Sequence, residues 1–249
     1  MTSLRRFFLE DITPESKEGC IKGTELIHLK KVLRLRTGDT ISLFNGKGLE
    51  LSGEIASIDV SSARVAIKGV IDNKNESPLE ITLVQGLIKG DKPELIIQKA
   101  VELGGRELIF FASARSVPDI GAGKDSARLA RWTNVAIAAA KQSKRPLVPD
   151  IMLCRNLKTA IESAAQGSLK LLLSNDASTL DLRAFLRKNT GISAVSAIVG
   201  PEGGLIAEEE TLAQSLGFVP ISLGPRTLRA ETAALSIVTL LQYELGDAN

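Results

Sequence analysis

Residues 81–105, ITLVQGLIKGDKPELIIQKAVELGG, decide the fold class of this chain. The segment begins with an apolar run of the length of one buried strand. A helix is predicted to follow, because Asp91 can cap it, Pro93 suits its first turn, and apolar residues then recur at helical spacing before two glycines. A strand followed by a helix is the repeating unit of α/β proteins.

The same alternation continues toward the end of the chain. Strand-like and helix-like segments follow one another as ELIFFA, SARLARWTNVAIAAAKQS, NLKTAIESAAQ, LKLLLS, SAVSAIVG, AEEETLAQSLG, FVPISLG and AETAALSIVTLLQYEL. Strands that are apolar throughout are typical of a parallel sheet buried on both faces. We therefore expect an α/β fold with a mainly parallel sheet between two layers of helices.

The N-terminal part follows a different pattern. Short segments of alternating polarity (RRFFLE, TISLFNG, LELSGEIASIDV and RVAIKGVID) are separated by glycines, which predicts a small β-barrel. One segment, HLKKVLRLRTGD, instead places Leu29, Val32 and Leu33 on one face of a helix. The polar stretch DNKNESP is typical of a linker, so we predict a barrel domain over residues 1–72 and an α/β domain over residues 73–249.

The composition excludes several kinds of site. The 249 residues carry a formal net charge of +2, so a nucleic-acid surface would have to be local. Cys20, Cys154 and the single histidine, His28, form no metal-ligand pattern, and we expect no metal. The phosphate-loop motif is absent, as is a GxGxxG fingerprint after the first strand of the larger domain. No segment has the roughly 20 apolar residues of a membrane span, and we expect a cytoplasmic protein.

Two Gly-Pro loops come directly after predicted strands. GPEGG (residues 200–204) follows SAVSAIV, and GPRTLR (residues 224–229) follows FVPISL. Ligands of parallel sheets bind beyond the carboxyl ends of the strands, so these loops would form opposite walls of one cleft. Taken singly, each loop also fits an ordinary turn, with Arg226 and Arg229 solvated and Glu231 complementing the dipole of the last helix. Acidic residues in the helix turn after GPEGG argue against an anionic ligand; they are Glu208, Glu209 and Glu210.

Basic residues gather in the small domain. The segment HLKKVLRLR contains no acidic residue, and Arg5-Arg6 lies in the same domain. Such clusters provide phosphate contacts to RNA, although a solvated helix face is the alternative. The candidate RNA-binding residues are Arg5, Arg6, Lys30, Lys31, Arg34 and Arg36.

Seven segments together resemble one known family in order and spacing. They are RRFFL, HLKKVLRLRTGD, FNGKGLE, KGDKPELIIQKAVELG, KQSKRPLVP, GPEGGL and LGPRTLRAETA, and the resemblance is to the RsmE family of 16S ribosomal RNA (uracil-N3)-methyltransferases. The resemblance implies a PUA-like RNA-binding barrel and a C-terminal SPOUT domain with a deep trefoil knot. It also implies a homodimer that uses S-adenosylmethionine to methylate N3 of one uridine in the assembled small ribosomal subunit. The cofactor-binding residues that it implies are Leu173, Gly200, Gly203, Leu223, Gly224 and Leu228.

The chemistry of this reaction suggests roles for the C-terminal loop. Uracil N3 must lose a proton, which favours a base and a cation beside the developing anion. Arg229 is the candidate cation, Arg226 a second one for RNA phosphate, and Glu231 either the base or the residue that orients Arg229. The alternatives are a ribose 2′-O-methyltransferase of the same fold and a non-catalytic RNA-binding assembly factor. The chain departs from the family pattern at Ala114-Arg115-Ser116, Lys141-Gln142-Ser143 and Leu205-Ile206.

Overall fold

The computed structural model describes residues 4–116, 120–121, 123–164, 169–174, 182–189 and 191–248. Its internal contacts divide the chain into two compact units. The first comprises Met1–Glu76 together with Ala140–Val148, and the second comprises Ser77–Ala139 and Pro149–Asn249. The return of residues 140–148 to the first unit is absent from the sequence prediction, which treats each domain as one continuous segment. No helix among the described residues is long and apolar enough to cross a membrane.

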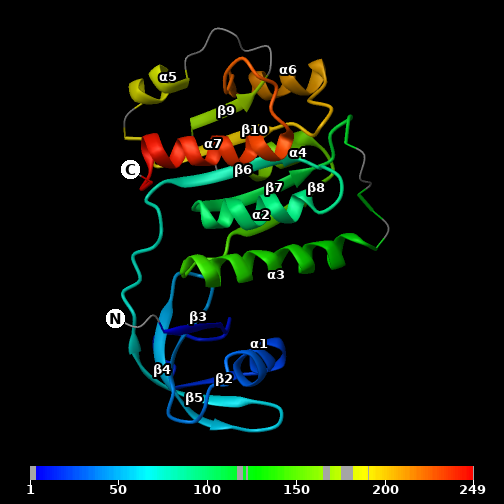
Figure 1. The fold of residues 1–249 in the computed structure, drawn as a ribbon. Coiled ribbons are helices and arrows are strands. Elements are labelled where there is room, and N and C mark those ends of the chain that lie inside the picture. Colours follow the sequence, from blue (N-terminus) through cyan, green and yellow to red (C-terminus); the bar gives the residue numbers. More distant parts are fainter. Residues whose placement is uncertain are drawn as a thin grey trace. The chain divides into compact units, whose positions relative to one another are not determined.

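The first unit is built on a curled five-stranded sheet (Figure 1). Strands β1 and β3 are parallel and the other neighbours are antiparallel, in the order β1-β3-β4-β5-β2. Its core contains apolar side chains of every strand, with Phe7, Leu43, Ile55 and Val65 fully buried. The strands are β1 (Arg5–Phe8), β2 (Glu18–Ile21), β3 (Thr40–Phe44), β4 (Glu50–Ile58) and β5 (Ala63–Val70).

The predicted basic helix has an unusual geometry. A short α-helix, α1 (Gly23–Ile27), continues into a π-helical turn, η1 (His28–Val32), in which the Leu33 N–H donates to the His28 carbonyl at 3.0 Å. A π-turn has more residues per turn than an α-helix, so positions that share a face in an α-helix separate. Leu29 is buried as predicted, whereas Val32 is 64% exposed. The predicted apolar face is therefore wrong at Val32.

Residues 140–148 are joined to other segments of the first unit by polar contacts. The Arg145 guanidinium pairs with Glu76 at 2.8 Å, and the Val148 N–H donates to the Gly46 carbonyl at 2.9 Å. Lys141, one of the departures from the family pattern, pairs with Glu25 of α1 at 2.7 Å. This segment is thus an integral part of the first unit.

The second unit contains one six-stranded, fully parallel sheet in the order β11-β9-β10-β6-β7-β8 (Figure 1). The prediction of an α/β fold with a parallel sheet is confirmed, although strand β8 and helix α5 were not predicted. The strands are β6 (Glu80–Gly86), β7 (Gly105–Phe111), β8 (Asp150–Cys154), β9 (Leu169–Leu173), β10 (Ala194–Val199) and β11 (Val219–Ile221). The helices are α2 (Lys92–Glu102), α3 (Asp125–Ser143), α4 (Leu157–Ser163), α5 (Leu182–Lys188), α6 (Ala207–Ser215) and α7 (Ala230–Leu245).

Five of these helices form two groups. Helices α2, α5 and α7 contact one another through α7, which also lies against β6 and β10. Helices α4 and α6 contact each other and enclose a core that includes Val84, Ile109, Leu172 and Ile198. Because the strands of the sheet are parallel, their carboxyl ends lie at one edge, where the loops that follow them can form a site.

Candidate active site

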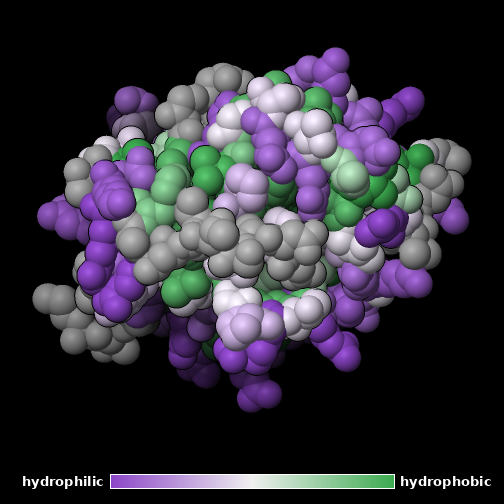
Figure 2. Space-filling view, turned by 90° about the horizontal axis from the view of Figure 1, so that it is seen from above, coloured by the Kyte–Doolittle hydropathy of each residue, from purple (hydrophilic) through white to green (hydrophobic). Residues whose placement is uncertain are grey.

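A cavity of about 630 Å³ lies at the carboxyl ends of β9, β10 and β11. Its walls are the residues that follow these three strands, together with the first turns of α2 and α7. Seen from the α5 and α6 end, hydrophilic and hydrophobic residues are interspersed (Figure 2). The lining residues outside the two Gly-Pro loops include Lys92, Arg115, Leu173, Ser174, Val199, Leu205, Glu210, Ile221 and Ala233.

The loop after β10 is held against β6 by close backbone contact. A Cβ atom at Gly86 would lie 2.6 Å from the Pro201 ring, so only glycine allows the approach. The Gly204 N–H donates to the Pro201 carbonyl at 2.9 Å, and Gly204 has a φ of 71°, which favours glycine. The buried Gln85 amide donates to the Gly200 carbonyl at 3.1 Å. The first cavity wall is therefore fixed by the end of β6.

The loop after β11 forms the facing wall. Gly224 has a φ of 109°, and the Ser222 hydroxyl donates to the Gly224 carbonyl at 3.1 Å. The loop ends at Arg229, which precedes α7, and the Arg229 carbonyl accepts from the Ala233 N–H at 2.8 Å. The side chains of Arg226 and Arg229 are exposed, and neither has an ion-pair partner among the described residues. Two uncompensated cations therefore lie at the cavity.

The cavity brings together most of the residues singled out in the sequence. Arg226 and Arg229 line it, whereas Glu231 is not among its lining residues. The Glu231 side chain is 14% exposed, and its Oε2 lies 3.4 Å from Lys92 Nζ. No ion pair joins Glu231 to Arg229 among the described residues, and the hypothesis that Glu231 orients Arg229 remains a prediction. All six candidate cofactor residues line the cavity, namely Leu173, Gly200, Gly203, Leu223, Gly224 and Leu228.

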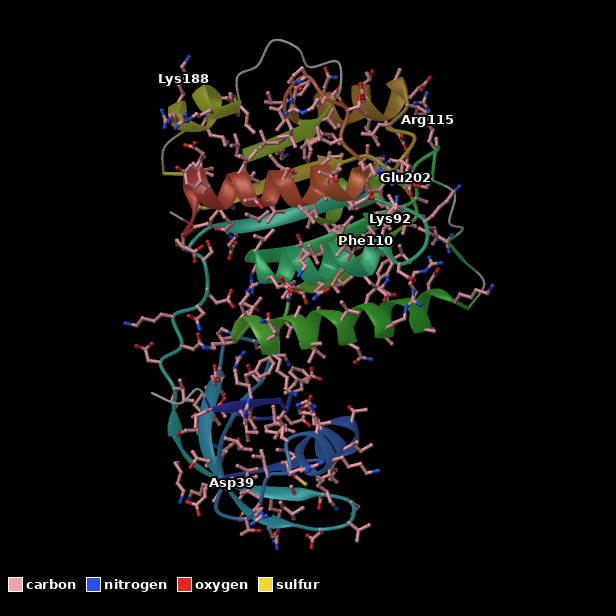
Figure 3. The ribbon with its side chains drawn as sticks, in the orientation of Figure 1. Asp39, Lys92, Phe110, Arg115, Lys188 and Glu202 are labelled. Carbon is pink, nitrogen blue, oxygen red and sulfur yellow. The ribbon has the colours of Figure 1, made fainter. Side chains whose placement is uncertain are left out.

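Sequence reasoning did not find Lys92 or Arg115. In Figure 3, Lys92, Glu202 and Arg115 lie at the same end of the sheet. Lys92 Nζ lies 3.5 Å from Glu202 Oε1, and Arg115 donates to the Gly203 carbonyl at 2.9 Å. Both cations belong to loops or helix ends that follow strands, and that position is the signal that could have found them.

Glu202 is ionised more readily than an ordinary glutamate. Burial alone would raise the pKa of this carboxyl, but hydrogen bonds from the backbone N–H groups of Lys89 and Glu202 and the charge of Lys92 outweigh it. The pKa of Glu202 is therefore lowered. Glu202 is thus a fixed negative charge that a cationic group of a ligand can approach, in a cavity that Lys92, Arg115, Arg226 and Arg229 also line.

The acidic turn after GPEGG has a structural role in part. Glu209 accepts hydrogen bonds from the Ser113 hydroxyl at 2.8 Å and from the Ile206 N–H at 3.1 Å, so it caps its own helix. Glu210 faces the cavity instead. The expectation that these residues disfavour an anion assumes that they occupy the positive end of the α6 dipole. Glu209 does so, because it accepts the Ile206 N–H at the start of α6.

The candidate RNA residues of the first unit divide into two groups. Arg6 is buried: its guanidinium pairs with Glu50 at 2.9 Å and donates to the carbonyls of Ala140 at 2.9 Å and Arg145 at 3.0 Å. It has no surface to offer a phosphate, which corrects the expectation for Arg6. The other five side chains are exposed, namely Arg5, Lys30, Lys31, Arg34 and Arg36.

Comparisons with protein families match both units. A model described as an RNA methyltransferase domain matches residues 75–242, and one described as an RNA methyltransferase PUA domain matches residues 21–68. The chain is 33% identical to ribosomal RNA small subunit methyltransferase E of Bacillus subtilis, with 97% of both chains covered. It is 30% identical to the protein of the same name from Buchnera aphidicola, with 97% of this chain and 94% of the relative covered.

Solved structures of similar proteins share the whole architecture. The ribosomal RNA small subunit methyltransferase E of Neisseria gonorrhoeae, bound to S-adenosyl methionine, has a TM-score of 0.88 and 32% identity over 99% of this chain and all of that one. A protein of Legionella pneumophila in complex with the cofactor SAM has a TM-score of 0.89 and 31% identity over the same shares of the two chains.

Proposed function

Because the chain belongs to the ribosomal RNA small subunit methyltransferase E family, we propose that it transfers a methyl group from S-adenosylmethionine to 16S ribosomal RNA. The finer assignment is N3 of one uridine, in the assembled small subunit. The observation that carries the proposal is the cavity of about 630 Å³ between the two Gly-Pro loops, in a chain 32% identical to a structure bound to this methyl donor. Since the substrate is ribosomal, we expect the reaction in the cytoplasm.

The residues of the cavity fit S-adenosylmethionine. Its volume lies in the range of small-molecule sites, and its glycine-rich walls let backbone groups approach a ligand closely. Leu173, Leu223 and Leu228 supply apolar surface, while Glu202 and Glu210 suit a positively charged ligand. We assign cofactor binding to Leu173, Gly200, Gly203, Leu223, Gly224 and Leu228.

The arginines of the C-terminal loop support the chemical step. The methyl donor supplies an electrophilic methyl group, so transfer to nitrogen requires in-line positioning of donor and base. Transfer of the N3 proton to water places negative charge on the uracil oxygens, and a fixed cation stabilises that charge. Arg229 suits this role because it is exposed at the cavity without an ion-pair partner among the described residues. Arg226, in the same loop, suits an RNA phosphate.

RNA binding is assigned to the first unit. Its five exposed candidates supply positive charge, and a family of RNA methyltransferase PUA domains matches residues 21–68. Phosphate contacts from such residues give affinity that falls with salt, whereas the target is selected at an unpaired base.

Two further features of the family are part of the proposal: a homodimer and a deep trefoil knot in residues 73–249. Both features rest on membership in the family and on the resemblance of the sequence to it.

The test is methylation of purified small subunits that lack the modification, with deproteinised 16S rRNA in parallel. The product is identified by mass spectrometry of nucleosides. We expect 3-methyluridine, formed faster on the subunits than on free RNA. A 2′-O-methylated nucleoside would contradict the N3 assignment. Absence of both methylation and donor binding in calorimetry would instead favour an RNA-binding assembly factor.

A further inference from the structure

Lys92, the first residue of α2, lies between two carboxylates at the mouth of the cavity. Its Nζ is 3.5 Å from Glu202 Oε1 and 3.4 Å from Glu231 Oε2. Glu202 belongs to the GPEGG loop and Glu231 to the first turn of α7. One ammonium group therefore joins three segments that are far apart in the sequence.

The two carboxylates are close enough to repel each other without Lys92. Both oxygens lie within 3.5 Å of the same nitrogen, so they are at most about 7 Å apart. Glu202 is tied down further, because its Oε1 accepts the Lys89 N–H at 3.1 Å. Glu231 has Lys92 as its ion-pair partner among the described residues, and its side chain is 14% exposed. The position of Glu231 thus depends on Lys92.

The segments that carry Lys92 and Glu202 are held rigidly. Pro93, next to Lys92, is buried in the first turn of α2, and α2 packs against α7. The GPEGG loop is fixed to β6 by the contact between Gly86 and Pro201. A side chain that extends from a rigid element can fix the position of the group that it contacts.

From this arrangement we infer that Lys92 is a positioning residue for methyl transfer. Its ammonium group holds Glu231 and, with it, the start of α7, so that Arg229 faces the bound base. Glu231 then acts through this bridge. This inference rests on the proposed function, since Arg229 acts only if the chain methylates RNA.

The effect on the reaction follows from geometry. Loss of the ammonium leaves two like charges in a partly buried site, and because the GPEGG loop is fixed to β6, their repulsion displaces the Glu231 side chain and the first turn of α7. A displacement of about 1 Å at a reacting group can cost up to about 100-fold in rate. The methyl donor is held mainly by backbone and apolar groups, so its affinity should change less than the rate.

The experiment compares Lys92→Met with Lys92→Arg and with the double variant Lys92→Met/Glu202→Gln. We expect Lys92→Met to lower kcat on small subunits by about tenfold or more, with donor affinity within about threefold in calorimetry. Lys92→Arg keeps the charge and should stay within about threefold of wild type. The double variant should regain at least about threefold in kcat, because only one carboxylate remains charged.

The matched control is Lys99→Met in the same helix. Lys99 pairs with Glu102 at 2.8 Å and does not line the cavity. It should leave kcat unchanged, and circular dichroism should show folded protein for every variant.

Full activity of Lys92→Met, or an equal loss in the double variant, would overturn the positioning role while leaving the proposed function in place. An inactive wild-type protein would overturn the proposed function itself. If Lys92→Met does not fold, the double variant is compared with the wild type. A folded double variant without measurable kcat contradicts the inference.

Discussion

Replacing Arg6 by methionine tests whether this residue stabilises the first unit or binds RNA. Its guanidinium donates to both Glu50 oxygens, at 2.9 and 3.1 Å, and to the carbonyls of Ala140, Lys141 and Arg145 at 2.9, 3.2 and 3.0 Å. The side chains of Arg6 and Glu50 are 7% and 5% exposed, so solvent screens this pair very little.

The expected loss in the free energy of unfolding follows from the groups that Arg6→Met leaves buried. Methionine fills part of the space but donates no hydrogen bond, so the buried Glu50 carboxylate loses its cationic partner and keeps the hydrogen bond from Asn73. Removing one partner of a buried pair costs about 3–5 kcal/mol, and we expect Arg6→Met to lower the free energy of unfolding of this unit by about 4 kcal/mol. The neighbouring exposed Arg5 provides the control, since Arg5→Met should stay within about 0.5 kcal/mol.

Hydrogen exchange locates the effect. Because the chain has two units, one unfolding curve does not assign a loss of stability to either of them. Exchange measured by mass spectrometry in residues 5–8 and 140–148 should accelerate in Arg6→Met and not in Arg5→Met. The double variant Arg6→Met/Glu50→Leu should recover most of the loss, because no charge stays buried. Equal exchange in Arg6→Met and Arg5→Met would refute the structural role of Arg6.

Three further predictions concern charge. Burial alone would raise the pKa of Glu50, but the hydrogen bonds from Arg6 and Asn73 and the Arg6 charge lower it overall. The contribution of Glu50 to stability is therefore present above its unfolded pKa and is lost as the pH falls through its lower folded pKa. Unfolding curves of Glu50→Gln should show less loss of stability in acid than those of the wild type. Arg229→Ala should lower kcat by about 100-fold with donor affinity in calorimetry within about twofold; a matching loss of affinity would assign Arg229 to the cofactor pocket. Reversing the charges of Lys31 and Arg34 should weaken RNA binding and reduce the slope of log affinity against log salt, whereas an unchanged slope would leave the η1 surface merely solvated.

The sequence predicted the class of the larger fold because its local patterns are strong. Apolar strands alternate with helices, and the observed sheet is parallel throughout. The order of the strands was out of reach, since periodicity shows which face of a segment is buried but not which strand lies beside it. The rule that parallel sheets bind ligands at their carboxyl ends was enough to select both Gly-Pro loops.

Arg6 and Lys92 show why other sequence predictions of the site were wrong or missing. The charge of Arg6 predicts a surface cation, but neighbouring residues in a strand point to opposite faces, so one arginine of Arg5-Arg6 has to point inward. Lys92 looked like an ordinary residue of a first helical turn. Its partners, Glu202 and Glu231, are more than a hundred residues away, and only the folded chain brings them within 3.5 Å.

The position of β10 has a consequence for how the protein is made. This strand pairs with both β6 and β9, yet it is the fifth of the six strands of its unit to be synthesised. On the growing chain, β6 therefore keeps one unpaired edge until translation has passed Val199, and unpaired edges invite association with other chains. Synthesis at high levels should consequently favour aggregation of incomplete chains, and slower translation or added chaperones should raise the yield of folded protein.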